Sequence, residues 1–207
     1  MDDLDSTHGL PYSGPDGFDG VYRSGAPPPW DIGRPQPALQ ALADAGLIGG
    51  KVLDAGCGTG EHALMAAALG LEATGLDFAA TAVEEARGKA GARGLPVRFV
   101  EGDALDLPAL GETFDTVIDC GLFHVLDDDQ RSAYVQGVTA VTRPGGRYFL
   151  LCFNEHVPGD AGPRRIRQHE IRDAFAEGWR VDGIEASSIT STIGPPIPAW
   201  LASLTRT

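Results

Sequence analysis

A chain of 207 residues is the length of one domain, and a hydrophobic fraction of 43% is enough to build its core. The net charge is −13, with 16 Lys and Arg against 29 Asp and Glu. This balance argues against a nucleic-acid partner, because phosphates require clustered basic side chains. No apolar run approaches the length of a membrane span and no basic-then-apolar segment opens the chain, so we expect no membrane contact.

The cysteine pattern indicates the redox compartment of the protein and whether it binds a metal. There are three of them, an odd number without a Cys-x-x-Cys pair, and each lies in or beside a predicted strand. This pattern predicts reduced thiols in a cytoplasmic protein and no metal site. Composition leaves the oligomeric state open between a monomer and a homodimer.

The first twenty residues are acidic, rich in glycine and poor in apolar side chains. Two interpretations stay open: a disordered tail, or a lid in which Phe18 and Tyr22 fold over a bound ligand. We therefore divide the chain into a flexible acidic tail or lid, 1–24, and a single domain, 25–207. The prolines before Trp30 hold its indole on a stiff, extended segment, where it is either a surface staple or a wall of a site.

Strands and helices alternate through the rest of the chain, as in an α/β fold. The apolar run 114–120 is typical of a strand in a parallel sheet that is covered on both faces. The expected helices are about 36–47, 61–69, 79–93, 130–142 and 168–177, and the expected strands are 51–57, 72–77, 96–101, 114–120, 147–153, 179–190 and 200–206.

A glycine-rich turn follows the first strand. Gly56, Gly58 and Gly60 alternate directly after the apolar run Val52–Ala55, and a helical pattern follows them. Glycines here let the backbone turn sharply and let a ligand lie against it without a Cβ in the way. The first turn of the next helix then offers free N–H groups and the positive end of its dipole.

Acidic residues end the next two strands. Asp77 closes the second strand, where a carboxylate can accept hydrogen bonds from both hydroxyls of a ribose. Asp103 closes the third strand and is expected beside the adenine end of a nucleoside. A glycine turn alone is weak evidence, but these two acids together with it predict a nucleoside site.

With these motifs in order, the sequence resembles the class I, Rossmann-like S-adenosylmethionine-dependent methyltransferases. The motifs are Val52–Gly60, Gly75–Asp77, Gly102–Ala104, Phe114–Asp119 and Pro144–Gly146. The resemblance implies a doubly wound, mostly parallel seven-stranded sheet, with the last strand inserted antiparallel and helices on both faces. It also implies S-adenosylmethionine as cofactor, S-adenosylhomocysteine as product and no metal.

Within this family, the sequence most resembles the small-molecule branch, which includes thiopurine, thiol/halide and heterocyclic-toxin methyltransferases. The segments behind it are Pro29–Pro37, Gly60–Leu64 and Pro198–Ala202. It implies methyl transfer to an S, O or N atom of a small aromatic or heterocyclic molecule. The cofactor-binding candidates are Trp30, Asp54, Gly56, Cys57, Gly58, Thr59, Gly60, Asp77, Phe78, Asp103, Ala104, Leu105 and Cys120.

The acceptor is expected outside the carboxyl ends of the fourth and fifth strands, where the ligand sits in open α/β sheets. The substrate-binding candidates are Phe18, Tyr22, Phe123, His124, Phe153, Arg164, Arg165 and Trp200. Trp200 is included because the resemblance implies it. His124 is a structural histidine, a substrate contact or a general base. The two arginines lie on a solvated face or hold an anionic or carbonyl-bearing substrate. Alignment alone can supply roughly 7–11 kcal/mol, so methyl transfer requires no dedicated base.

Other classes of function remain. An NAD-dependent oxidoreductase uses a similar turn, but the Gly-x-Gly-x-Gly spacing and the Gly102-Asp103 strand end disfavour it. A non-catalytic nucleoside-binding module is disfavoured because both the turn and the ribose acid are intact. A methyltransferase acting on protein or RNA is less favoured in a short chain with a net charge of −13.

Overall fold

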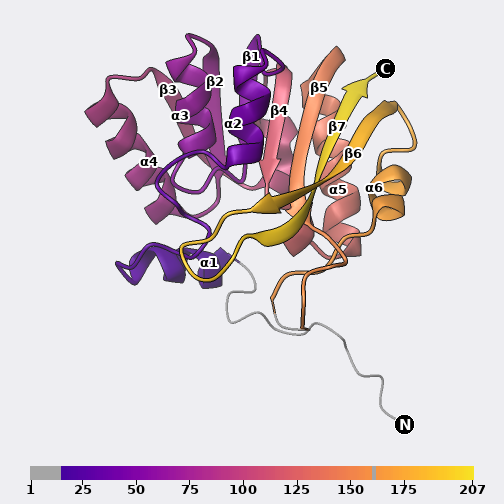
Figure 1. Cartoon of the computed structure of the whole chain (residues 1–207). Coiled ribbons are helices and arrows are strands. Elements are labelled where there is room, and N and C mark those ends of the chain that lie inside the picture. Colours follow the sequence, from indigo (N-terminus) through magenta and orange to yellow (C-terminus); the bar gives the residue numbers. More distant parts are fainter. Residues whose placement is uncertain (1–14, 160–161) are drawn as a thin grey trace.

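The computed structural model describes residues 15–159 and 162–207, which form a seven-stranded sheet with α-helices on both faces (Figure 1). The strand order is β3-β2-β1-β4-β5-β7-β6. The strands are β1 Lys51–Ala55, β2 Glu72–Asp77, β3 Val97–Glu101, β4 Phe114–Cys120, β5 Thr142–Phe153, β6 Trp179–Ile189 and β7 Ile197–Arg206. The helices are α1 Pro15–Arg23, α2 Pro37–Asp44, α3 Glu61–Ala68, α4 Ala80–Arg93, α5 Asp128–Val141 and α6 Gln168–Ala174, with 3-10 turns at Ala104–Leu110 and Phe123–Val125.

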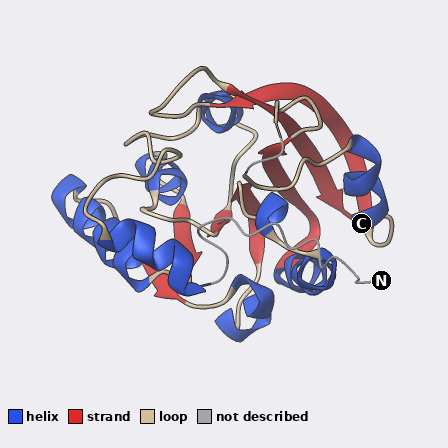
Figure 2. Cartoon of the chain, turned by 90° about the horizontal axis from the view of Figure 1, so that it is seen from below, coloured by secondary structure: helices blue, strands red, loops and turns tan. Residues whose placement is uncertain are grey.

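The topology confirms the fold expected from the resemblance. The pairs β1–β2, β1–β4, β2–β3 and β4–β5 are parallel, and β7 lies antiparallel between β5 and β6. The direction of winding changes between β1 and β4, which is where ligands bind in doubly wound sheets. The carboxyl ends of the parallel strands lie at the lower edge of the sheet in Figure 1 and face the viewer in Figure 2.

Alternate side chains of each central strand enter different cores, as the pleat of a strand requires. In β4, Val117 joins the core beneath α5 and α6, whereas Ile118 joins the core beneath α2 and α3. All of these side chains are buried. Because both faces are covered, the strand ends are the part of the sheet that is left for a ligand.

Two elements differ from the sequence prediction. The stretch at Pro15–Arg23 was assigned to a tail or a lid and forms helix α1, which packs against α4. Strand β5 begins at Thr142 rather than at 147, because Thr142 pairs with Phe114 before a register shift that accommodates the Pro144–Gly146 turn. Residues 1–14 lie outside the described part of the chain, so the lid interpretation remains a prediction.

Gly60 is a glycine in the turn whose replacement the packing resists. It has a φ of 86°, and a Cβ there would lie 2.5 Å from the Phe99 ring and 2.9 Å from Ala86. Gly70 has a similar φ of 79°, but a Cβ there would meet nothing within 4 Å.

Gly60→Ala should therefore lower the free energy of unfolding by about 1–3 kcal/mol more than Gly70→Ala does. Both variants carry the strain of a left-handed backbone, so the difference isolates the clash with Phe99. Urea denaturation of both variants and the parent measures it. Equal losses would show that the glycine turn moves away from Phe99 at no cost.

Candidate active site

A cavity of about 450 Å³ opens at the carboxyl ends of the strands. It runs from the ends of β1 and β2 to those of β4, β5 and β6. Its walls are Phe18, Tyr22, Pro29, Trp30, Asp31, Ile32, Arg34, Gln36, Gly56, Cys57, Gly58, Thr59, Glu61, His62, Asp77, Phe78, Ala104, Cys120, Gly121, Leu122, His124, Val125, Phe153, Gly162, Pro163, Ile189, Ser191, Ile193 and Ile197. Asp31, Glu61 and Asp77 lie beside the glycine turn. Apolar side chains form much of the remaining cavity wall.

Most of the predicted cofactor residues line this cavity. They are Trp30, Gly56, Cys57, Gly58, Thr59, Asp77, Phe78, Ala104 and Cys120. The structure brings them together because β1, β2 and β4 are neighbours, so the loops after these strands meet at one edge.

The remaining four cofactor candidates are not among the residues that line the cavity. Asp103 is exposed, and its carboxylate accepts the Leu105 N–H at 2.8 Å, so it caps the 3-10 turn. Leu105 packs against the core, and Gly60 is the residue before α3. Asp54 lies behind the glycine turn and is 1% exposed.

Asp77 shapes the glycine turn. One oxygen of its carboxylate accepts the Gly58 N–H at 2.8 Å, and the other accepts the Ala79 N–H at 2.9 Å. The Gly56 and Cys57 N–H groups both bond to the Leu76 carbonyl. Burial raises the pKa of Asp77, against the lowering effect of these N–H donors. The end of β2 thus holds the turn that follows β1.

Asp54 and His62 form a buried pair behind this turn. Asp54 accepts the Ala63 N–H at 3.1 Å, and its other oxygen has no hydrogen-bond partner among the described residues. That oxygen lies 3.9 Å from Nδ1 of His62. Burial raises the pKa of Asp54 to about 7 and lowers that of His62 to about 4. His62 is therefore neutral, and its Nε2 accepts the Gln36 N–H at 3.2 Å.

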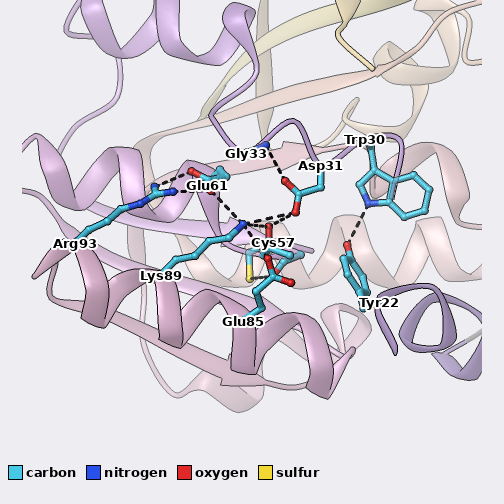
Figure 3. A network of polar contacts seen from close by, with 11 residues as sticks. Tyr22, Trp30, Asp31, Gly33, Cys57, Glu61, Glu85, Lys89 and Arg93 are labelled. Carbon is cyan, nitrogen blue, oxygen red and sulfur yellow. Dashed lines mark hydrogen bonds and ion pairs between the residues drawn. The ribbon is translucent and has the colours of Figure 1, made fainter. Parts of the chain in front are cut away.

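A polar network joins the segment after Trp30 to the glycine turn (Figure 3). Asp31 accepts the Thr59 hydroxyl at 2.6 Å, and Lys89 donates to the same hydroxyl at 2.7 Å. The Lys89 amine also lies 3.2 Å from Glu61, which Arg93 binds through both of its terminal nitrogens. Burial raises the pKa of Glu61, but the bonds from Arg93 and Lys89 outweigh it and hold the pKa below its usual range.

Aromatic side chains of α1 and its neighbours cover the turn. Trp30 donates its indole N–H to the Tyr22 hydroxyl at 3.1 Å (Figure 3), and Phe18 packs edge-on against both Trp30 and Phe78. A Cβ on Gly58 would lie 2.8 Å from the Tyr22 hydroxyl. The close approach of Tyr22 therefore depends on glycine at position 58.

His124 lines the opposite end of the cavity and is 5% exposed. Its Nδ1 accepts the Phe153 N–H at 2.9 Å, and its ring lies 4.3 Å from that of Phe153. Burial, assisted by Arg165, lowers the pKa of His124 to about 3. The ring is therefore neutral, with its proton on Nε2. No group in the described part of the chain accepts a hydrogen bond from this Nε2–H.

Four predicted acceptor residues are not among those that line the cavity. Phe123 is fully buried and stacks with Arg131, and Trp200 donates its N–H to Glu155 and to the Ile166 carbonyl. Arg164 binds Asp128 and Glu170, and Arg165 donates to the carbonyls of Pro158, Gly159 and Pro163. Both arginines are thus engaged in fixing the loop after β5. Phe18, Tyr22, His124 and Phe153 do line the cavity.

Sequence reasoning missed the wall formed by the end of β6 and the loop before β7. Ile189, Ser191, Ile193 and Ile197 belong to it. No motif marks these residues, and only the antiparallel insertion of β7 brings them to the cavity. It also missed Gln36 and His62 as wall residues, although both stand within the segments that carried the resemblance.

Neither a metal centre nor a membrane span is found in residues 15–159 and 162–207. No cluster of three or more His, Cys, Asp or Glu side chains there could hold a metal ion. No helix in the same ranges is long and apolar enough to cross a bilayer.

Residues 52–146 match the methyltransferase domain family. The 2-heptyl-1-hydroxyquinolin-4(1H)-one methyltransferase of Mycobacteroides abscessus is 37% identical over 183 residues, which are 84% of this chain and 81% of that protein. The chain belongs to the S-adenosylmethionine-dependent methyltransferases that act on small molecules. As a member of this enzyme family, the methyltransferase is neither the oxidoreductase nor the binding module considered above.

Solved structures agree with this assignment. One, from work on the conversion of a disulfide bond into a thioacetal group during echinomycin biosynthesis, is 42% identical to the methyltransferase. It covers 93% of each chain with a TM-score of 0.84. The magnesium protoporphyrin IX methyltransferase of Synechocystis with bound S-adenosylmethionine shares the fold at 22% identity and a TM-score of 0.64. That match covers 92% of this chain and 80% of the other.

Asp54→Asn should stabilise the methyltransferase at pH 8 and lose most of that advantage by pH 4.5. The pKa of Asp54 is raised in the fold, so its charge opposes folding above about pH 7, and this cost is relieved as the pH falls toward the unfolded value of 3.8. We expect a gain on the order of 1–4 kcal/mol at pH 8. Urea denaturation at both pH values measures it, and an equal gain at both would contradict a buried charge at this position.

Proposed function

We propose that this methyltransferase transfers the methyl group of S-adenosylmethionine to an oxygen atom of a flat, largely apolar heteroaromatic molecule, of the kind that an N-hydroxyquinolone represents. The observation that carries the proposal is the far end of the cavity. There the neutral Nε2–H of His124 lies beside Phe153, and the cavity lining includes Val125, Pro163 and several isoleucines. Apolar walls with few placed polar groups suit such a ligand. The relative from Mycobacteroides abscessus, named for a hydroxyquinolone, supports it.

The cofactor belongs at the acidic end. S-adenosylmethionine carries a positive sulfonium and an ammonium group, and Asp31, Glu61 and Asp77 line this end with Asp54 behind them. Gly56 and Gly58 both line the cavity, so the turn backbone itself forms part of the wall at this end. In this proposal Asp77 accepts the ribose hydroxyls, Asp103 does not take part, and Trp30 covers the methionine end.

Catalysis in this proposal rests on alignment and exclusion of water. The cofactor supplies an activated methyl group, which transfers in line to the acceptor. His124 acts as an orienting donor rather than as a base, since its Nδ1 is occupied and its Nε2 already carries the proton. An acceptor oxygen that is ionised near neutral pH needs no base, and the Nε2–H can hold it or a neighbouring carbonyl oxygen.

A sulfur acceptor is the second candidate. It is favoured by the likeness to the structure from the thioacetal work, which is 42% identical. A thiolate also attacks without a base, so the same cavity serves either atom. The proposal places the enzyme in the cytoplasm, where its free cysteines Cys57, Cys120 and Cys152 would stay reduced.

Asp77→Ala should weaken S-adenosylmethionine binding by roughly 5- to 150-fold, because charge-assisted bonds to the ribose hydroxyls are lost. Asp103→Ala is the matched control, since it removes an acid that follows the next strand and is not among the residues lining the cavity. Isothermal titration measures both, with thermal unfolding to confirm that each variant is folded. Equal affinities in the two variants would remove Asp77 from the cofactor site.

A methyl-transfer screen over hydroxyquinolones, phenols, thiols and N-heterocycles, read by mass spectrometry, tests the acceptor class. His124→Asn is the informative variant, because the Asn amide oxygen can replace Nδ1 as acceptor for the Phe153 N–H while the Nε2–H is removed. We expect kcat/KM for an oxygen acceptor to fall about 10- to 100-fold, with cofactor affinity unchanged.

The pH profile separates the roles of His124. An orienting donor with a pKa of about 3 gives no titration of its own between pH 5.5 and 8. A limb near pH 6–7 that disappears in His124→Asn would instead establish His124 as a base. Transfer to thiols alone would favour the second candidate.

A further inference from the structure

Two segments far apart in the sequence are joined across the mouth of the cavity. The side-chain oxygen of Gln36 accepts the Thr190 N–H at 2.8 Å, and its amide nitrogen donates to the Thr190 carbonyl at 3.0 Å. The Pro29 carbonyl accepts the Thr192 N–H at 2.9 Å. We call these bonds the Gln36 clasp. The clasp ties the segment before α2 to the loop between β6 and β7.

Gln36 is a buried polar residue whose polar atoms are committed to this clasp. It is 3% exposed, and both ends of its amide are bonded to Thr190. Its backbone N–H donates to His62 Nε2 on α3. Gln36 lines the cavity, and each polar atom of its side chain bonds Thr190. Its bonds reach in two directions, to α3 and to the loop.

The loop held by the clasp carries one wall of the cavity. Ile189, Ser191, Ile193 and Ile197 line the cavity from this side. Ile193 is 67% exposed, so packing of its side chain does little to fix the loop backbone. The loop follows β6, which β5 and β7 separate from β4 in the sheet, and the clasp sets it beside Pro29 and Gln36.

We propose that Gln36 is a positioning residue that holds the loop 190–196 in place as the acceptor-facing wall, and so sets the affinity and selectivity for the acceptor. This inference rests on the proposed function, because it assigns the β6–β7 side of the cavity to the acceptor. In this proposal the effect of Gln36 passes through the backbone of Thr190 to Ser191 and Ile193 in the loop.

Gln36→Ala removes the side-chain half of the clasp. The Thr190 and Thr192 amides should exchange with solvent at least about 10-fold faster, because two bonds to a buried amide are lost. KM for the best acceptor of the screen should rise about 10-fold. The ratio of kcat/KM between large and small acceptors should move closer to one. The S-adenosylmethionine Kd, measured by titration, should stay within about twofold.

Two further variants test whether the effect is specific to the side-chain bonds of Gln36. Gln40→Ala is the matched control, because Gln40 lies one turn further along and bonds only its own helix, at Asp44. Gln36→Glu preserves the volume but sets a carboxylate against the Thr190 carbonyl, so it should loosen the loop at pH 8. Protection should return at low pH, where the introduced carboxyl is protonated and donates again.

The inference is overturned if Gln36→Ala leaves amide exchange of residues 190–197 and acceptor KM unchanged. It is also overturned if cofactor affinity falls as much as acceptor KM rises, since Gln36 would then support the whole site. A parent enzyme that methylates none of the screened compounds would count against the proposed function. Exchange of the loop amides, which needs no turnover, would still decide whether Gln36 holds the loop.

Discussion

Buried carboxylates at the ends of neighbouring strands organise this structure. Asp54, next to the last residue of β1, accepts the Ala63 N–H of α3. Asp77 accepts the Gly58 and Ala79 N–H groups. Asp119 in β4 accepts the Leu122 N–H and the hydroxyls of Tyr134 and Tyr148. Each acid fixes the loop that follows or faces its strand. Burial raises the pKa of all three, to about 6 for Asp119, so the loops around the cavity are shaped at a cost in electrostatic free energy.

The cavity is divided by charge as a consequence. Acids lie around the glycine turn, while His124 is kept neutral by burial at the apolar end. In the proposed arrangement, a cationic cofactor and an uncharged or anionic aromatic acceptor would therefore meet different surroundings on the two sides of one cavity. Since the alignment of two ligands is what methyl transfer needs most, this division accounts for a site with few candidate catalytic groups.

Much of the fold could be predicted, because glycines punctuate it and apolar runs mark its strands. The limits expected for β2 and β4 match the structure. Helix α1 could not be predicted, because Phe18 packs on Trp30 and Phe78, contacts that local propensity does not contain. Asp103 follows a strand as Asp77 does, but its carboxylate accepts the nearby Leu105 N–H and it is not among the residues lining the cavity. The wall beside Ile193 depends on the order β5-β7-β6, which no single segment encodes.

The position of β7 also bears on the order in which this chain can fold during synthesis. Gln36 and Thr190 are 154 positions apart, and β7 must enter between two strands that precede it. The glycine turn can form once β1, β2 and α3 have left the ribosome, whereas the β6–β7 side of the cavity must wait for residues 197–206. Pairings of such long range are slow to form. The nascent chain therefore has the elements of its glycine turn well before it has the β6–β7 wall of the cavity.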